Sequence, residues 1–170
     1  SDVCSSDLAI NTAVNSGEEF PYFREFWLKR PEQGSNKMTV YALLDSPSAT
    51  GGYEFVITVE ETTLMEVKAT VFLRSNPQKV GIAPLTSMFF YGENTHLRGK
   101  HDFRPEVHDS DGLLIQSNTG EWIWRPLLNP DELLVTSFHL KSPKGFGLLQ
   151  RDKNFDHYQD LETHYEKRPN

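Results

Sequence analysis

Carboxylates and aromatic rings gather in one stretch of this 170-residue chain, between residues 104 and 126. Its first part reads RPEVHDSDG (104–112) and its second part reads GEWIWRP (120–126). Carboxylates supply hydrogen bonds and transfer protons, and aromatic faces stack on the apolar side of a pyranose ring. A sugar-binding cleft needs this combination of side chains, although the same residues also suit an ordinary β-hairpin.

Three carboxylates of this stretch, Glu106, Asp109 and Asp111, lie close together in the sequence. Asp109 and Asp111 precede Gly112, and they are also the residues that a turn at this place favours. From spacing alone, the turn is the preferred interpretation. A metal site made of His108, Asp109 and Asp111 is the less favoured alternative, because the calcium-loop pattern does not continue after Gly112. We therefore predict no metal and no cofactor.

The two tryptophans of the second part, Trp122 and Trp124, are two positions apart. On a strand they share one face, and Ile123 points to the other. The pair is either part of the core or an exposed platform on which a sugar stacks. Ile123 is the better core residue, and both interpretations stay open. Arg104 and Arg125 flank the stretch and can pair with the nearby carboxylates.

Composition and charge exclude several classes of function. The net charge is -7 and no Lys/Arg-rich block is present, which argues against a nucleic-acid partner. The apolar runs are too short for a membrane span. The single cysteine, Cys4, cannot form an internal disulfide and leaves the redox compartment open. The sequence contains no Gly-rich phosphate loop, no Ser-His-Asp order and no nucleophilic cysteine context.

Alternation of apolar and polar side chains predicts the strands that would position these residues. The clearest strands are expected over 37–44, 53–59 and 63–74. Further strands are expected over 8–14, 113–116, 121–125, 133–141 and 148–151, with an irregular or edge strand over 80–91. Many short strands with little helix between them predict a mainly β fold, an antiparallel β-sandwich or a curved β-sheet domain.

Two N-terminal segments interrupt this pattern. Residues 18–28 are rich in aromatic side chains, and the spacing of Phe23, Phe26 and Trp27 predicts one or two helical turns. These rings either cover a sheet edge or form a wall of a sugar site. The clearest loop is expected over 45–52, where the sequence reads DSPSATGG.

A short helix is predicted near the C-terminus, over 155–167. Tyr158, Leu161 and Tyr165 would share one face of it, and Asp156 would lie near its start, where acids favour the helix dipole. The helix either presents an ordinary solvated face or lies across the mouth of a cleft and lends Tyr165 to a ligand.

Six motifs occur along the chain: GEEFP (17–21), ALLDSP (42–47), GIAPLTSM (81–88), RPEVHDSDG (104–112), GEWIWRP (120–126) and GFGLLQR (145–151). In this order they closely resemble the periplasmic glucan biosynthesis protein G/D family of Gram-negative bacteria. The resemblance runs from about Leu8 to Pro169. Residues 1–7 do not fit it, and we expect them to be a non-native leader.

The resemblance implies a fold and a place in the cell. Members of the family have a large N-terminal β-sandwich domain of the galactose-mutarotase-like type, followed by a smaller immunoglobulin-like domain. Residues 8–170 resemble the later middle part of the large domain, so we expect a partial domain without the signal sequence and the C-terminal domain. The implied partner is an osmoregulated periplasmic glucan with a β-1,2-linked backbone, with contact to the glucan synthesis machinery as a further expectation.

The resemblance also implies site residues. Members have been linked to cleavage of β-1,2-glucan with inversion, and the general base of the family falls on Asp109. Tyr165 matches a substrate-contacting tyrosine. The acid of the family is an aspartate beyond residue 170, so we expect this chain alone to be inactive. The remaining expected site residues would stack on sugar rings (Trp122, Trp124) or orient the site (Glu106, His108, Arg104, Arg125).

Two other classes of function stay open beside the glucanase. One is a non-catalytic module that binds glucan and guides its synthesis or branching. The other is a structural β-domain without a ligand, which predicts that Trp122 and Trp124 are buried.

Overall fold

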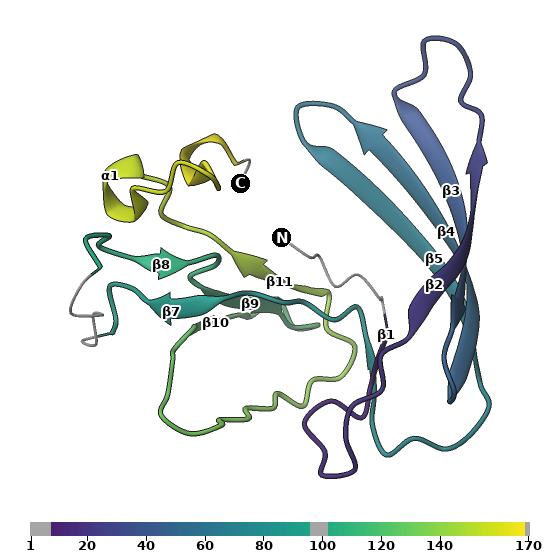
Figure 1. The fold of residues 1–170 in the computed structure, drawn as a ribbon, viewed down its shortest axis with the longest axis horizontal. Coiled ribbons are helices and arrows are strands. Elements are labelled where there is room, and N and C mark those ends of the chain that lie inside the picture. The colour runs from purple at the N-terminus through teal and green to yellow at the C-terminus, as the bar shows by residue number, and fades with distance from the viewer. Residues whose placement is uncertain (1–7, 96–101, 169–170) are drawn as a thin grey trace. The chain divides into compact units, whose positions relative to one another are not determined.

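The computed structural model describes residues 8–95 and 102–168 (Figure 1). The expected leader 1–7, including Cys4, lies outside the described residues. The chain divides into two units, Ser1–Pro84 and Leu85–Asn170. The described part is mainly antiparallel β-sheet, which confirms the predicted fold class. The galactose-mutarotase-like arrangement of the sheets stays a prediction. No described helix is long and apolar enough to span a membrane.

The first unit contains a four-stranded antiparallel sheet whose strands follow one another in chain order. They are β2 (Tyr22–Lys29), β3 (Lys37–Asp45), β4 (Ala49–Val59) and β5 (Thr63–Leu73). A separate pair joins β1 (Leu8–Ile10) to β6 (Val80–Ile82). The strands expected over 37–44, 53–59 and 63–74 are confirmed, because each has one apolar and one polar face.

The helical turns predicted over 18–28 are wrong, since β2 occupies most of this segment. The register of β2 on β3 shifts between Phe23 and Glu25. This bulge adds one residue, so Phe23 and Phe26 point to the same face of the sheet although they are three positions apart. Their ring centroids lie 5.7 Å apart. Trp27 points to the opposite face of the sheet. A bulge in a strand can therefore produce the same spacing of apolar residues in the sequence as a helix does.

The loop predicted over 45–52 is also wrong, because the hairpin between β3 and β4 is much tighter. The side-chain oxygen of Ser46 accepts a hydrogen bond from the Ala49 N–H at 3.1 Å, and the Ser46 N–H donates to the Ala49 carbonyl at 2.8 Å. The strand then continues through Gly51, where an added Cβ would lie 3.0 Å from the Thr70 carbonyl oxygen. The glycine permits a close approach of backbone here, rather than a loop.

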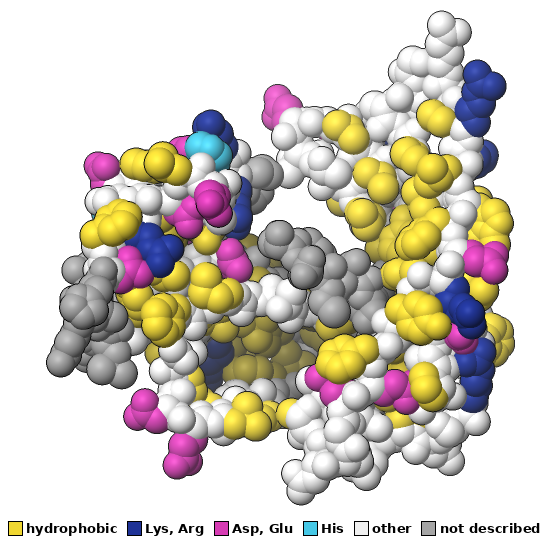
Figure 2. Space-filling model, viewed as in Figure 1, with side chains coloured by type: hydrophobic (Ala, Val, Ile, Leu, Met, Phe, Trp, Pro, Cys, Tyr) yellow, Lys and Arg dark blue, Asp and Glu magenta, His cyan; other side chains and the backbone are white. Residues whose placement is uncertain are grey.

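The core of the first unit lies on one face of this sheet, which we call the inner face. Its buried residues are Leu8, Ile10, Ala42, Leu44, Ala49 and Tyr53. The apolar side chains continue along β5, where Val67 and Leu73 are half exposed. They line an open apolar pocket of about 570 Å³. Figure 2 shows hydrophobic side chains gathered over these strands.

The second unit is built on β9 (Gly112–Gln116), which pairs with β10 (Trp122–Pro126) on one side and β11 (Gly145–Leu149) on the other. A shorter pair joins β7 (Phe89–Tyr91) to β8 (Val107–His108). The hairpin predicted over 113–125 is confirmed.

The strand predicted over 133–141 is wrong, because none of these residues lies in a strand. Leu133 is 84% exposed, and its neighbours Leu134 and Val135 are exposed too. The free side of β9 is taken instead by β11. In place of the one irregular or edge strand expected over 80–91, the structure has two short strands, β6 and β7, separated by the segment around Pro84.

The continuous helix predicted over 155–167 is wrong in its length. The structure has one α-helical turn, α1 (Phe155–Tyr158), and one 3-10 turn, η1 (Tyr165–Lys167). Between them the Asp160 side chain accepts hydrogen bonds from the N–H groups of Glu162 and Thr163, at 2.9 and 3.0 Å. Such local bonds compete with a helix and end it.

Candidate functional site

Asp109 lies in the short connection between β8 and β9, and its side chain is 40% exposed. The Tyr165 hydroxyl donates a hydrogen bond to Oδ1 of Asp109 at 3.1 Å. The Met88 N–H donates to Oδ2 at 3.3 Å, and the Asp109 N–H donates to the Met88 carbonyl at 2.8 Å. Nη1 of Arg168 lies 3.9 Å from Oδ1. Asp109 is thus held in place while part of its carboxylate stays open to solvent, as a general base requires.

Tyr165 is buried, and its ring is fixed from two sides. The Tyr158 ring lies 4.5 Å from it between centroids, and the Arg168 guanidinium lies 4.3 Å from its centroid. Burial and the negative charge of Asp109 raise the pKa of the Tyr165 phenol. The phenol therefore stays protonated at neutral pH and donates to Asp109. An open pocket of about 470 Å³ adjoins them, lined by Asp109, Ser110, Leu148, Leu149, Gln150, Arg151 and Arg168.

A second group of polar side chains starts from Glu106 and His108. Both are buried, and Nε2 of His108 lies 2.7 Å from Oε2 of Glu106. The His108 ring stacks on Phe89 at 4.8 Å and meets Tyr158 edge-on at 5.1 Å. Around them lies a pocket of about 530 Å³, whose wall also contains Asp111, Trp124, Arg151, Asp152 and His157.

Two sets of three residues in this group have ligand atoms within 4.8 Å of one another: Glu106, His108 and Asp111, and Glu106, Asp152 and His157. These are the described residues that could hold a cation. However, Glu106 already bonds to His108, and Asp152 bonds to His157. Asp111 in turn accepts hydrogen bonds from the backbone N–H groups of Arg151 and Asp152. The geometry favours a hydrogen-bonded cluster, and the absence of a metal stays a prediction.

The structure distributes the expected site residues over two pockets. Glu106, His108 and Trp124 line the pocket with the buried histidine, whereas Asp109 lines the other. His108 and Asp109 are consecutive in the chain, yet they line different pockets. Arg151 lines both pockets.

Four of the expected residues line neither pocket, and one of them, Tyr165, bonds to Asp109 from behind the pocket wall. Arg104 pairs with Asp102 through Nε and Nη2, at 2.9 and 2.7 Å, and lowers the pKa of that carboxyl. The Arg125 guanidinium lies 5.2 Å from the centroid of Phe138. Trp122 is 58% exposed, which is the opposite of what a structural domain without a ligand predicts.

Residues that the sequence did not single out also belong to the site. Arg151 ends the motif GFGLLQR, and Arg168 lies three positions after Tyr165. Asp152 and His157 belong to an acidic and histidine-rich segment that suits a solvated helix face. The position of Arg151 in a motif is the one signal that could have pointed to it.

The absence of a side chain at Gly112 leaves room for the indole of Trp124. An added Cβ at Gly112 would lie 2.5 Å from Cζ2 of Trp124 and 2.6 Å from the Arg125 carbonyl oxygen. Gly112→Ala therefore has to displace the indole or the β10 backbone, and we expect it to lower the free energy of unfolding by about 1–3 kcal/mol. Urea unfolding followed by tryptophan fluorescence measures this change.

The matched control is Gly147→Ala in β11 of the same sheet, where nothing lies within 4 Å of an added Cβ. We expect it to leave the free energy of unfolding nearly unchanged. Equal stability of the two variants would contradict the packing of Trp124 on Gly112.

The pair Asp152 and His157 predicts how stability depends on pH. The hydrogen bond with Asp152 raises the pKa of His157 above 6.5, against the effect of burial. Burial acts to raise the pKa of Asp152, but hydrogen bonds from the Asn154 N–H and from His157 lower it below 3.8. The His157 contribution is complete below pH 6.5 and is lost as the pH rises through its raised pKa. The Asp152 contribution is present above pH 3.8 and is lost as the pH falls through its lowered pKa.

We therefore expect the unfolding free energy to fall on the alkaline side as His157 loses its proton, and His157→Gln to remove this loss. Proton NMR of the imidazole and urea unfolding at several pH values check it. An imidazole that titrates below 6.5 is the contrary result.

Comparison with known proteins gives one consistent result. The family model described as "Periplasmic glucan biosynthesis protein, MdoG" matches residues 4–170. The chain is 59% identical over 162 residues to "Glucans biosynthesis protein G" of Ralstonia nicotianae, covering 95% of this chain and 32% of the relative. It is 54% identical to the protein of the same name from Pseudomonas paraeruginosa, covering 95% of this chain and 31% of the relative.

A third relative, "Probable glucans biosynthesis protein D" of Shewanella oneidensis, is 56% identical, with 95% of this chain and 30% of the relative covered. The chain thus spans about a third of the length of the curated relatives it matches.

Proposed function

Since this chain belongs to the family of periplasmic glucan biosynthesis proteins, we propose that it forms part of a periplasmic protein that binds a β-1,2-linked glucan backbone and hydrolyses it with inversion. The observation that carries the proposal is the half-exposed Asp109 carboxylate, which accepts a hydrogen bond from the buried phenol of Tyr165 beside an open pocket. Asp109 lines this pocket, while Tyr165 lies buried behind it.

Inverting hydrolysis divides two proton transfers between two groups. One group protonates the leaving glycosidic oxygen, and the other removes a proton from the water that attacks the opposite face of the sugar. Asp109 takes the second task. The proton reaches its Oδ1 directly from water, or through the Tyr165 hydroxyl, which passes on its own proton and takes one from the water. The C–O bond to the leaving sugar breaks as the water oxygen bonds to the anomeric carbon.

The acid for the first task would be an aspartate of the full-length protein beyond residue 170. The two carboxyl groups of an inverting enzyme lie roughly 6.5–9.5 Å apart, which leaves room for the water. Asp111 is a poor candidate for the acid, because its Oδ2 already accepts backbone hydrogen bonds from Arg151 and Asp152.

Groups around Asp109 suit the hydroxyls and the apolar faces of a sugar. Arg151 and Arg168 line the same pocket and can donate hydrogen bonds to hydroxyls. The exposed indole of Trp122 lines neither pocket, but it offers a stacking face on β10. In this proposal Glu106 and His108 orient the neighbouring pocket wall, since both are buried and bonded to each other.

A second candidate is glucan binding without cleavage, to guide synthesis or branching. The division of the expected site residues between two pockets favours it, because only one of them contains Asp109.

One experiment separates the two candidates. The full-length protein is incubated with β-1,2-glucan, and proton NMR follows the new reducing ends. Inverting cleavage of a β-linkage yields the α-anomer first, before mutarotation. If the protein binds glucan in a native gel but produces no new reducing ends, the non-catalytic binding function is supported and hydrolysis is excluded. If it neither binds nor cleaves glucan, both candidate functions are excluded.

A further inference from the structure

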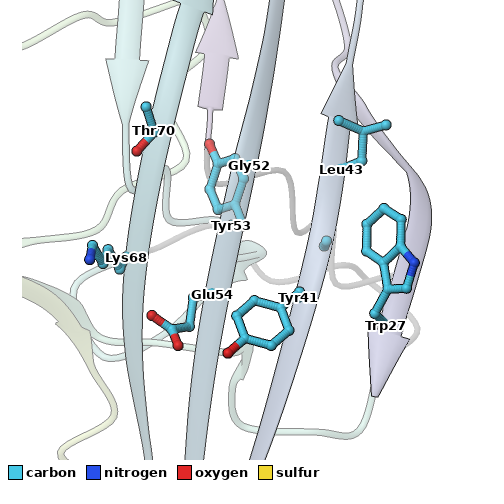
Figure 3. A pocket seen from close by; sticks show the side chains of 9 residues that line it. Trp27, Tyr41, Leu43, Gly52, Tyr53, Glu54, Lys68 and Thr70 are labelled. Atoms are coloured by element: carbon cyan, nitrogen blue, oxygen red, sulfur yellow. The ribbon is translucent and has the colours of Figure 1, made fainter. Parts of the chain in front are cut away.

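A row of four side chains crosses the outer face of the four-stranded sheet, opposite the core. Trp27 on β2 pairs in register with Tyr41 on β3, Tyr41 with Glu54 on β4, and Glu54 with Lys68 on β5. Register partners share a face of the sheet, so all four point outward, away from the buried neighbour Ala42. Figure 3 shows this row, with the Tyr41 hydroxyl directed toward the Glu54 carboxylate.

Beside this row the sheet has a hollow at Gly52. The next row contains Leu43, Gly52 and Thr70. An ideal Cβ on Gly52 would meet nothing within 4 Å, so the space above this glycine is open. The two rows line a pocket of about 320 Å³. This volume lies at the lower end of small-molecule sites, which begin at about 300 Å³.

The aromatic side chains of Trp27 and Tyr41 line this pocket. Trp27 is 50% exposed and Tyr41 is 40% exposed. Figure 3 shows both rings nearly face-on to a viewer who looks onto the sheet, so their faces are offered outward. Hydrogen bonding with Glu54 and the negative charge of that carboxylate raise the pKa of the Tyr41 phenol. Flat aromatic rings suit the apolar face of a pyranose.

The charges of the pocket select the kind of ligand. Glu54 and Lys68 are the charged residues of the lining, one of each sign. They cancel, so the pocket favours a neutral ligand rather than an anion or a cation. Together with Thr70 they supply both donors and acceptors, which hydroxyl groups use. A neutral polyol with an apolar face is a sugar.

From these contacts we infer that the hollow around Gly52 is a second glucan-binding site, in which one or two glucose units stack on Trp27 and Tyr41 and bond to Glu54 and Lys68. The identity of the ligand rests on the function proposed above. Among the described residues that line the pocket, Glu54 is the one carboxylate, so they offer no acid/base pair, and the site binds without cleaving. It would raise the local concentration of long glucan chains near the protein.

The test uses the full-length protein and a native gel that contains polymeric β-1,2-glucan. Trp27→Ala is expected to weaken binding of the polymer roughly 2- to 10-fold, the range that aromatic contacts supply. The matched control is Phe72→Ala, an exposed ring on the same outer face that does not line the pocket. We expect it to bind as the unchanged protein does.

Further variants keep the result interpretable. Glu54→Gln and Lys68→Met change the polar contacts without removing a ring, and both are expected to weaken binding. Circular dichroism checks that each variant folds. Asp109→Asn is expected to lose cleavage, and Trp27→Ala is expected to weaken glucan binding by the same factor in the Asp109→Asn background.

Two results would overturn the inference. In the first, the variants Trp27→Ala, Glu54→Gln and Lys68→Met bind glucan as tightly as the unchanged protein does. In the second, light scattering shows that the variants no longer self-associate, although they still bind glucan. This face would then be an interface between copies of the protein. If the unchanged protein binds no glucan, the proposed function itself fails. If the unchanged protein binds glucan and the variants bind equally well, only the second site fails.

Discussion

Asp109→Asn in the full-length protein is expected to lower the rate of β-1,2-glucan cleavage by about 10²- to 10⁴-fold while glucan binding stays nearly unchanged. Asparagine has the size of aspartate, and its side-chain oxygen can accept the hydrogen bond that Tyr165 donates. It cannot take a proton from water. The loss should therefore appear in the rate of formation of reducing ends and not in binding in the native gel.

The matched control for this variant is Asp131→Asn, at an exposed position of the same unit that lines neither pocket. It should cleave as the unchanged protein does. Full activity of Asp109→Asn would remove Asp109 as the base, and a loss of binding would make it a ligand-contacting residue instead.

Leu44→Ala is expected to lower the stability of the first unit by about 2–5 kcal/mol. Leu44 is fully buried in the core with Leu8, Ile10 and Tyr53. Its replacement removes buried apolar atoms and leaves a cavity, because neighbours on two sheets cannot all move inward. Amide hydrogen exchange of β3 and β4 measures the change in the full-length protein, since it reports the stability of each segment.

The matched control is Leu64→Ala on β5, where the side chain is exposed. Its effect is expected to stay within about 0.5 kcal/mol. Equal loss of protection in the two variants would show that Leu44 does not belong to the core as described.

Strands that alternate apolar and polar side chains could be predicted from the sequence, and bulged or unpaired segments could not. The segment 63–74 alternates cleanly and forms β5. In β2, one extra residue between Phe23 and Glu25 shifts the alternation and gives the rings helical spacing. The segment 133–141 is apolar enough for a strand, but β11 occupies the free side of β9. Which segment pairs with β9 depends on contacts between distant residues.

The site could be predicted only in part. Spacing alone favoured a turn for Asp109, and the residue does lie in the connection between two strands. The family resemblance pointed to both Asp109 and Tyr165. The structure joins these two residues, 56 positions apart in the chain, by a hydrogen bond. That His108 and Asp109 line different pockets does not follow from their adjacency. It depends on where the C-terminal segment with Tyr158 packs.

The most direct measurement is a crystal structure of the full-length Asp109→Asn variant with a β-1,2-linked gluco-oligosaccharide. We predict that the sugar occupies the pocket beside residue 109, with a water or a sugar hydroxyl within hydrogen-bond distance of that side chain or of the Tyr165 hydroxyl. An oligosaccharide bound elsewhere, with neither residue 109 nor Tyr165 near its glycosidic bonds, would contradict a catalytic role of Asp109.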